Sequence, residues 1–167
     1  MDGQMTIERA RPEDAAAVFE LYHALIDSPY GTWSEEYPSR ELVYGDVQAG
    51  KTLVMRTADG GIAAAIAVLD QEDEPEFDEA GAWYKDVRKW SVPARLGVAK
   101  AMQGRGLAKR MLEAAMNEGR GRGCDGVRFL VAKGNVIALR AYAAFGFDVC
   151  GECDMWGDSW LCYQKRL

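Results

Sequence analysis

The segment from Leu96 to Ala108 combines the residue types that bind a diphosphate. A short strand-like run, Leu96-Gly97-Val98-Ala99, is followed by Gln103-Gly104-Arg105-Gly106-Leu107-Ala108, where a helix is predicted to begin. A strand that passes through a glycine turn into a helix leaves main-chain N–H groups without internal partners. Because glycines allow close approach and a helix N-terminus favours anions, this turn predicts a site for a phosphate-bearing ligand.

A second set of residues with chemical potential follows one predicted strand later. Asn135, Ala138, Tyr142, Gly146 and Phe147 form the pattern N-x-x-A-x-x-x-Y-x-x-x-G-F. Spacings of three and four residues place the first three on one face of a helix. Taken alone, the pattern is best explained as a helix cap, a packed alanine and a core tyrosine. Its position directly after the glycine turn favours a shared site.

Other phosphate, nucleophile and metal sites are disfavoured by what the sequence lacks. The turn has no Gly-Lys-Ser/Thr, as a nucleoside-triphosphate loop would, and it does not match a dinucleotide-binding fingerprint. With His23 as the single histidine, a histidine-based triad or a multi-histidine metal site is not expected. Cys150 and Cys153 have C-x-x-C spacing, but without a second pair they are better explained as small apolar strand residues than as a redox or zinc site. We therefore predict no metal.

The apolar periodicity predicts the elements that position these residues, in one domain over residues 1–167. The first helix begins at Pro12 and ends near Asp27-Ser28-Pro29, and Asn135 caps a helix that reaches Phe145. The pattern is α+β, with one hairpin-rich sheet and helices packed on its faces. The predicted strands cover about 6–9, 52–56, 62–69, 95–99, 127–131, 147–153 and 160–165, and two further helices cover about 39–48 and 107–118.

Three connections carry recognisable turn signals. Asp59-Gly60-Gly61 between two apolar runs predicts a hairpin. The segment 70–79 holds seven acids and one proline, which is typical of a solvated loop. The glycine series at 119, 121 and 123 is expected to stop the third helix.

The overall composition favours a soluble globular protein. Apolar residues make up 49% of the chain and charged residues 28%, and no run of eighteen apolar residues occurs. The start of the chain, 1–10, lacks the apolar stretch of a secretory signal, so a cytoplasmic location without membrane association is expected. A net charge of −6 argues against nucleic acid as the main partner.

Together, the two motifs resemble those of the GCN5-related N-acetyltransferase (GNAT) superfamily. Gln103, Gly106 and Ala108 resemble the Q-x-x-G-x-A pyrophosphate loop of that family, and 135–147 resembles its following helix. The order of predicted elements is similar over nearly the whole chain. The resemblance implies a three-layer fold with a mixed, mostly antiparallel sheet of about seven strands, helices on both faces, and a splay between the fourth and fifth strands.

The resemblance also implies roles for individual residues toward acetyl-CoA as co-substrate. Main-chain groups near Leu96, Val98 and Ala99 would pair with the pantetheine arm, as an added strand does. Asn135 and Ala138 would contact the same arm, and Tyr142 would lie beside the thioester sulfur. Lys100 replaces a proline found in many relatives, which changes the stiffness of the turn. The pyrophosphate would be held by the amides of Gln103, Gly104, Arg105, Gly106, Leu107 and Ala108.

For such an enzyme we expect direct attack of an amine on the thioester within a ternary complex. The N–H of Val98 or Ala99 would stabilise the developing oxyanion, and Tyr142 would protonate the departing thiolate. Deprotonating an amine of pKa about 10.4 at pH 7 costs about 4 to 5 kcal/mol, so a base or a water chain is required. Asp70 and Glu72 are the candidate bases, although a solvated acidic loop is the simpler explanation for them. The acidic stretch could alternatively attract a cationic acceptor.

The acceptor is not defined by the sequence, and a small-molecule amine and a peptide amine both fit. Arg105 is the basic residue expected to reach the phosphates. Four aromatic residues in loops could line the acceptor pocket, the core or a homodimer interface, and these alternatives stay open. The four aromatic residues are Trp33, Tyr37, Trp83 and Tyr84.

A rival function keeps the fold and the cofactor without catalysis. The protein would then be an acyl-CoA sensor or interaction module.

Overall fold

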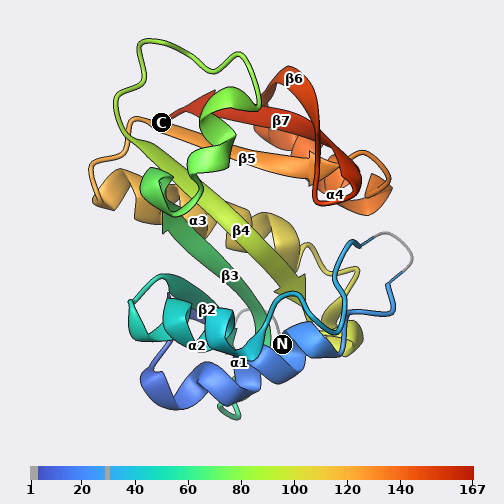
Figure 1. Ribbon diagram of the computed structural model, residues 1–167. Helices are drawn as coiled ribbons and strands as arrows, with labels where there is room; N and C mark the ends of the chain where they lie inside the picture. Colours follow the sequence, from blue (N-terminus) through green and yellow to red (C-terminus); the bar gives the residue numbers. More distant parts are fainter. Residues whose placement is uncertain (1–3, 29–30) are drawn as a thin grey trace.

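A computed structural model describes residues 4–28 and 31–167, and these form a mixed seven-stranded sheet with helices on both faces (Figure 1). Predictions that involve residues 1–3 and Pro29 lie outside the described residues. No helix in the described ranges is both long and apolar enough to cross a membrane. The elements are β1 (Thr6–Arg9), α1 (Ala15–His23), α2 (Arg40–Gln48), β2 (Thr52–Arg56), β3 (Ile62–Asp70), β4 (Trp90–Val98), α3 (Leu107–Gly121), β5 (Gly126–Ala132), α4 (Val136–Tyr142), β6 (Asp148–Met155) and β7 (Asp158–Arg166).

The sheet confirms the predicted splay between the fourth and fifth strands. The strand order is β1-β2-β3-β4-β5-β7-β6, and every neighbouring pair is antiparallel except β4 and β5. These two parallel strands pair only at Trp90↔Gly126 and Ser91↔Val127. Beyond Ser91 the edge of β4 has no strand partner, so the two strands separate toward their carboxyl ends.

Pro93 lies where the β4–β5 pairing stops, and it accounts for a strand longer than predicted. Pro93 pairs with Val68 of β3, and the Val68 N–H donates away from β4, to the Lys51 carbonyl at 2.7 Å. By the alternation of an antiparallel ladder, the polar groups of Pro93 therefore face β5. A proline has no N–H to donate there, so the next rung of the β4–β5 ladder cannot form. The predicted start of this strand at Arg95 was five residues too late.

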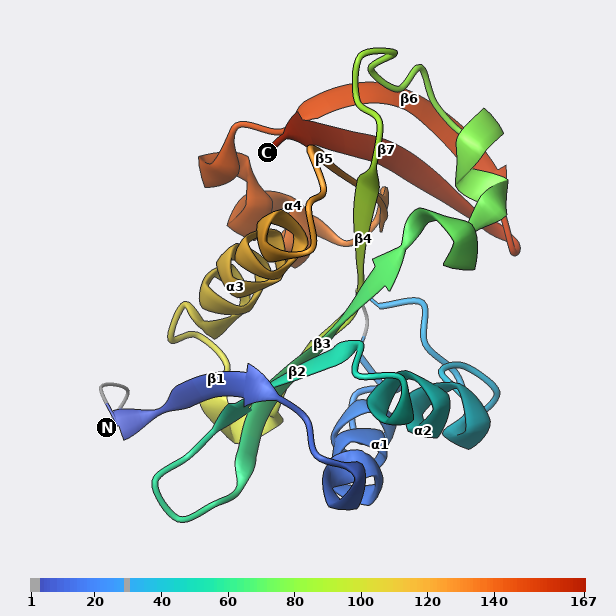
Figure 2. The same ribbon diagram turned by 90° about the vertical axis from the view of Figure 1, so that its left-hand side faces the viewer.

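The central strand β3 is buried on both faces, which its nearly continuous apolar sequence explains. Ala64, Ile66 and Val68 belong to the core cluster under α3, whereas Ala65 packs in a second cluster with α1 and α2. Figure 2 shows α3 and α4 on one side of the sheet and α1 and α2 on the other. The sheet is thus the middle layer of three, as predicted.

Two helices have bounds that differ from the predicted ones. A Cβ on Gly119 would lie 2.9 Å from the Ser91 side chain, so α3 contacts β4 through this glycine and continues past it to Gly121. Gly123, with φ of 84°, ends the α3 region, which is later than the predicted end near residue 118. The first helix is shorter than predicted, because 12–14 form a 3₁₀ turn and the α-helix ends at His23.

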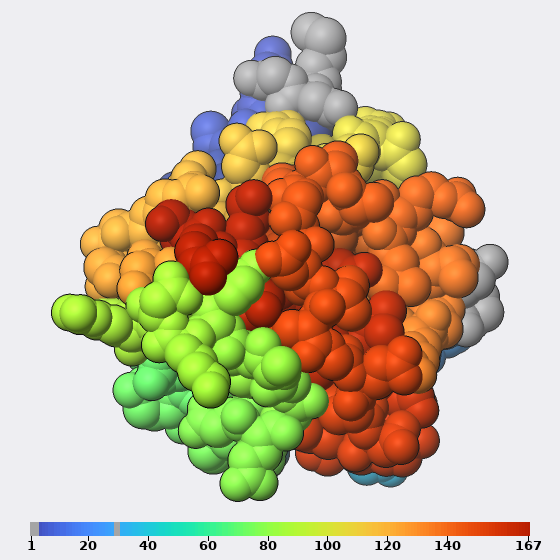
Figure 3. All heavy atoms as spheres, turned by 90° about the horizontal axis from the view of Figure 1, so that it is seen from above, coloured from blue at the N-terminus to red at the C-terminus, as the bar shows by residue number. Residues whose placement is uncertain are grey.

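The acidic segment that follows β3 is more ordered than the predicted solvated loop. It forms two 3₁₀ turns, Gln71–Asp73 and Pro75–Glu79. Phe77 is buried in a small core cluster with Leu69 and Val92, and this apolar contact holds the acidic turns against the sheet. Figure 3 shows the green segment that continues from these turns lying beside the orange-red β6–β7 hairpin. The Ala82 N–H donates to the Cys150 carbonyl at 3.0 Å across this contact.

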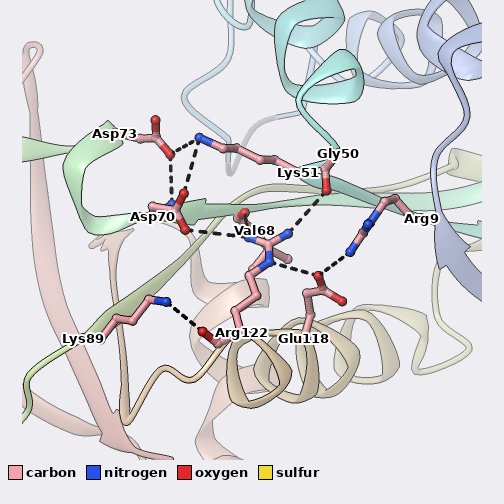
Figure 4. A network of polar contacts seen from close by, with 9 residues as sticks. All are labelled: Arg9, Gly50, Lys51, Val68, Asp70, Asp73, Lys89, Glu118 and Arg122. Atoms are coloured by element: carbon pink, nitrogen blue, oxygen red, sulfur yellow. Dashed lines mark hydrogen bonds and ion pairs between the residues drawn. The ribbon is translucent and has the colours of Figure 1, made fainter.

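A network of polar contacts joins the end of α3 to the sheet (Figure 4). Arg122 donates from Nε to Glu118 at 2.9 Å and from Nη1 to the Val68 carbonyl at 2.7 Å. Lys51 reaches across to Asp73 at 2.7 Å and to Asp70 at 3.6 Å. Asp70, one of the two predicted bases, is therefore held in a structural ion-pair network.

We expect Arg122→Ala to lower the free energy of unfolding by about 1–3 kcal/mol, because it leaves the buried Val68 carbonyl without its side-chain donor. For a chain of this size, each kcal/mol lowers the Tm by about 2–4 °C. Thermal unfolding followed by circular dichroism measures the shift. Arg120→Ala is the matched control, since Arg120 is exposed and its side chain donates a hydrogen bond to Asn117 of its own helix. Equal Tm values for both variants would contradict a structural role for the network.

Candidate active site

The splay between β4 and β5 contains a cleft of about 1000 Å³. Adjacent residues of β5 line it from opposite faces of the sheet: Phe129 packs in the cluster under α3, and Leu130 packs in the cluster with Phe77. The cleft therefore runs through the sheet and has two compartments. The α3-side compartment is lined by Leu96, Val98, Leu107, Phe129, Val131 and Tyr142, and the opposite compartment by Trp33, Tyr37, Glu74, Phe77, Arg95 and Leu130.

The predicted glycine turn forms the end of the α3-side compartment. Gly104 and Gly106 have φ values of 81° and 75°, a left-handed conformation that favours glycine. The first hydrogen bond of α3 runs from the Arg110 N–H to the Gly106 carbonyl at 3.3 Å. The amides of the first helical turn, Leu107 to Lys109, therefore have no partner within the helix. This arrangement offers donors to an anionic ligand.

Most of the predicted cofactor residues line the cleft together, while two do not. Ala99 and Arg105 are absent from the lining, and Arg105 is exposed. Lys109, one turn into α3, lines the cleft instead. The predicted residues that the structure brings together here are Leu96, Val98, Gln103, Gly104, Gly106, Leu107, Ala108, Asn135, Ala138 and Tyr142.

The hydrogen bonds at the end of β4 distinguish the amides of Val98 and Ala99. The Ala99 N–H donates to the Ala63 carbonyl at 2.8 Å, so it is engaged within the sheet. Val98, which pairs with Ala64, must then direct its own N–H and carbonyl away from β3 and toward the cleft. The Gln103 side chain donates to this Val98 carbonyl at 3.0 Å. The Val98 N–H is thus the amide at this point that faces a ligand.

Tyr142 and Asn135 occupy opposite ends of α4. Asn135 caps the helix as predicted, its side chain accepting from the Ala138 N–H at 3.1 Å. Tyr142 is buried, packs edge-on against Phe129 at 5.6 Å between ring centroids, and lines the cleft. Burial raises the pKa of its hydroxyl above the ordinary value, with a smaller contribution from Tyr163. Tyr142 therefore stays protonated at neutral pH.

The opposite compartment contains a buried arginine that the sequence did not mark as special. Arg95 lies in a bulge of β4 with φ of 53°, which is rare for a non-glycine residue. Its guanidinium is 3% exposed and donates to Asp46 at 2.5 Å and to the Tyr37 hydroxyl at 3.2 Å. Its Nε has no partner among the described residues.

The acids of the segment after β3 differ in how they relate to the cleft. Glu74 lines the cleft, whereas Glu72, the other predicted base, is exposed and does not. Burial raises the pKa of Glu74, and the positive charge of Arg95 only partly offsets this effect. Glu74 is half-buried and close to a cation that Asp46 already neutralises.

The aromatic residues proposed for the acceptor pocket divide into two pairs. Trp33 and Tyr37 line the cleft. Trp83 and Tyr84 instead pack against Trp90, at 5.9 and 6.5 Å between ring centroids. The β6–β7 hairpin adds two tryptophans, Trp156 in the turn and Trp160 in β7, which local sequence patterns did not connect with the site.

The sequence, the fold and the cleft define the class of protein to which the chain belongs. A sequence model described as "Acetyltransferase (GNAT) family" matches residues 18–147, well over half of the chain. The chain belongs to this family of acetyltransferases. Its family membership and its fold, both expected from the two motifs, are thereby confirmed.

Similar proteins of known sequence match only in part. The chain is 34% identical over 85 residues to a Bacillus subtilis subsp. natto protein named "Probable spermine N(1)-acetyltransferase", which covers 50% of this chain and 53% of that protein. It is 39% identical over 65 residues to "Acetyltransferase Atu2258" of Agrobacterium fabrum, covering 39% of this chain and 46% of that one. The matched stretch thus spans about half the length of these relatives.

Solved structures match over almost the entire chain. A GNAT family acetyltransferase from Streptococcus agalactiae has a TM-score of 0.79 at 25% identity, covering 98% of this chain and 95% of that one. The Salmonella typhimurium protein yncA, solved with its cofactor acetyl-CoA, has a TM-score of 0.75 at 20% identity, covering 98% and 94%. The second similarity concerns the fold alone.

Proposed function

We propose that this protein transfers an acetyl group from acetyl-CoA to an amine acceptor, by direct attack within a ternary complex. The observation that carries the proposal is the cleft through the sheet. Its α3-side compartment ends at the glycine turn, and its opposite compartment holds polar and aromatic groups. Two substrates entering from the two faces would meet between β4 and β5.

The α3-side compartment fits the donor. The amides of the glycine turn and of Leu107 to Lys109 would hold the diphosphate, because they lack partners within the helix. The unpaired edge of β4 near Leu96 and Val98 would hydrogen-bond to the pantetheine arm as an added strand does. When bound, acetyl-CoA supplies the activated acyl group.

Val98 and Tyr142 are the groups of this chain proposed to act on the reacting atoms. The Val98 N–H would donate to the thioester oxygen as negative charge develops on it. Tyr142, kept protonated by burial, would donate its hydrogen to the departing sulfur. The amine nitrogen forms the new bond to the acetyl carbon, the carbon–sulfur bond breaks, and the proton lost by the amine leaves to solvent.

The acceptor is proposed to be an aliphatic amine of the kind suggested by the Bacillus relative's name. The experiment is a panel of amines with acetyl-CoA, including polyamines, amino acids and peptides, followed by the release of free thiol. We expect turnover with at least one aliphatic amine. Tight binding of acetyl-CoA without turnover on any amine would instead favour an acyl-CoA sensor.

A further inference from the structure

Glu74 is a half-buried carboxylate in the cleft without a partner of its own. None of the ion pairs or side-chain hydrogen bonds formed by the described residues involves it. The other acid of the lining, Asp27, is paired with Lys100 at 2.9 Å. A buried charge normally has a partner, because removing it from water is costly. Glu74 lines the cleft, so its missing partner is expected to be a ligand.

The charges around Glu74 make that ligand a cation. Arg95 from β4 is the nearest positive group, but Asp46 from α2 neutralises it through a direct ion pair. Within the segment that carries Glu74, the neighbouring charged residues are Asp73, which forms an ion pair with Lys51, and Glu76. The net charge at this end of the cleft is therefore negative.

The walls of this compartment also suit a positively charged aliphatic group. Trp33, Tyr37 and Phe77 line it, and aromatic faces attract cations in sites that are shielded from water. The Arg95 and Asp46 pair fixes the hydroxyl of Tyr37 through the 3.2 Å hydrogen bond. The compartment is thus already shaped before a ligand enters.

We propose that the acceptor carries two amine nitrogens, and that Glu74 binds the one that does not react. This inference rests on the proposed acetyl transfer and assigns its acceptor class. The reacting nitrogen would lie near Val98, three residues along β4 from Arg95, which is roughly 10 Å of extended strand. Because Glu74 interacts with Arg95 at the far end of this stretch, two nitrogens separated by a short alkyl chain would let one pair with Glu74 while the other approaches Val98.

The test compares 1,4-diaminobutane with pentylamine, which has the same length but a methyl group in place of the second ammonium. We expect the wild-type protein to prefer the diamine at least tenfold in kcat/KM. Glu74→Gln keeps the shape of the side chain and removes its charge, so the ratio of the two kcat/KM values should fall close to one, mainly through a higher KM for the diamine. Glu79→Gln, at an exposed site outside the cleft and not among the charges that act on Glu74, should keep the wild-type ratio.

Each alternative outcome has a distinct meaning. A wild-type-like ratio in Glu74→Gln, or no preference for the diamine in the wild type, would overturn the assignment of Glu74 while leaving acetyl transfer intact. An equal loss of kcat on both amines would show that Glu74 acts on the reacting nitrogen, which also overturns it. If no amine released thiol with wild-type protein, the proposed function itself would fail. Affinity for CoA, measured in parallel, shows that each variant is folded.

Discussion

Tyr142→Phe should lower kcat about 10²-fold while leaving the dissociation constant of CoA nearly unchanged. The change removes one oxygen from a residue that lines the α3-side compartment and keeps its ring against Phe129. General-acid groups typically contribute 10²–10⁴-fold. We expect the lower end of this range, because burial raises the pKa of the hydroxyl and makes it a weaker acid toward a thiolate. Steady-state thiol release and calorimetry measure the two quantities.

Tyr163→Phe is the matched control for this variant. Tyr163 belongs to the same aromatic cluster, 5.7 Å from Phe129 between ring centroids, but it does not line the cleft. The same chemical change there should leave kcat within a factor of about two. Similar rates for Tyr142→Phe and the wild type would show that this hydroxyl is not needed, and the acid assignment would have to be withdrawn.

Gly106→Val should weaken CoA binding by about 10- to 100-fold. The left-handed conformation of Gly106 costs other residues about 1–2 kcal/mol, and a β-branched side chain more. The backbone would relax toward φ below zero, which redirects the amides that open α3. Because about 1.4 kcal/mol corresponds to a tenfold change in affinity, the stated range follows. Calorimetric titration with CoA measures it directly.

Gly60 in the β2–β3 hairpin provides the control for backbone strain. Its φ is 90°, and, as at Gly106, an added Cβ would meet nothing within 4 Å. Gly60→Val should therefore lower stability by a similar amount without changing the affinity for CoA. Gly106→Asn should keep much of the affinity, since asparagine tolerates this conformation better than valine does. If Gly106→Val and Gly60→Val bound CoA with equal affinity, the conformation of the glycine turn would not matter for CoA binding, and the prediction would be wrong.

The parts of the fold that the sequence predicts are those with local causes. Ser39 and Asn135 cap their helices through side-chain hydrogen bonds at 3.1 Å, and Gly146 adopts a φ of 70° after α4. The Asp59-Gly60-Gly61 turn joins two antiparallel strands. In each case the residue type itself satisfies a backbone requirement, so the element is predictable without tertiary contacts.

The features that escaped prediction depend on partners far along the chain. Arg95 is buried because Asp46, 49 residues earlier, neutralises it. The burial of Phe77 helps to hold the acidic segment against the sheet, and in this position Glu74 lines the cleft whereas Glu72 does not. Trp156 and Trp160 line the cleft together with Trp33, which lies far earlier in the chain, and no local pattern encodes that proximity. Pro93 fits inside β4 because its missing N–H lies on the side where β4 separates from β5, which only the sheet topology reveals.

The central claim is that main-chain amides at the start of α3 hold the diphosphate of CoA, and calorimetry tests it most directly. Wild-type protein would be titrated with CoA, with dephospho-CoA, which keeps the diphosphate, and with pantetheine, which lacks it. We predict that dephospho-CoA binds nearly as well as CoA and that pantetheine binds at least about 100-fold more weakly, a difference of about 2.7 kcal/mol. Comparable affinities for CoA and pantetheine, or no binding of CoA, would contradict the claim.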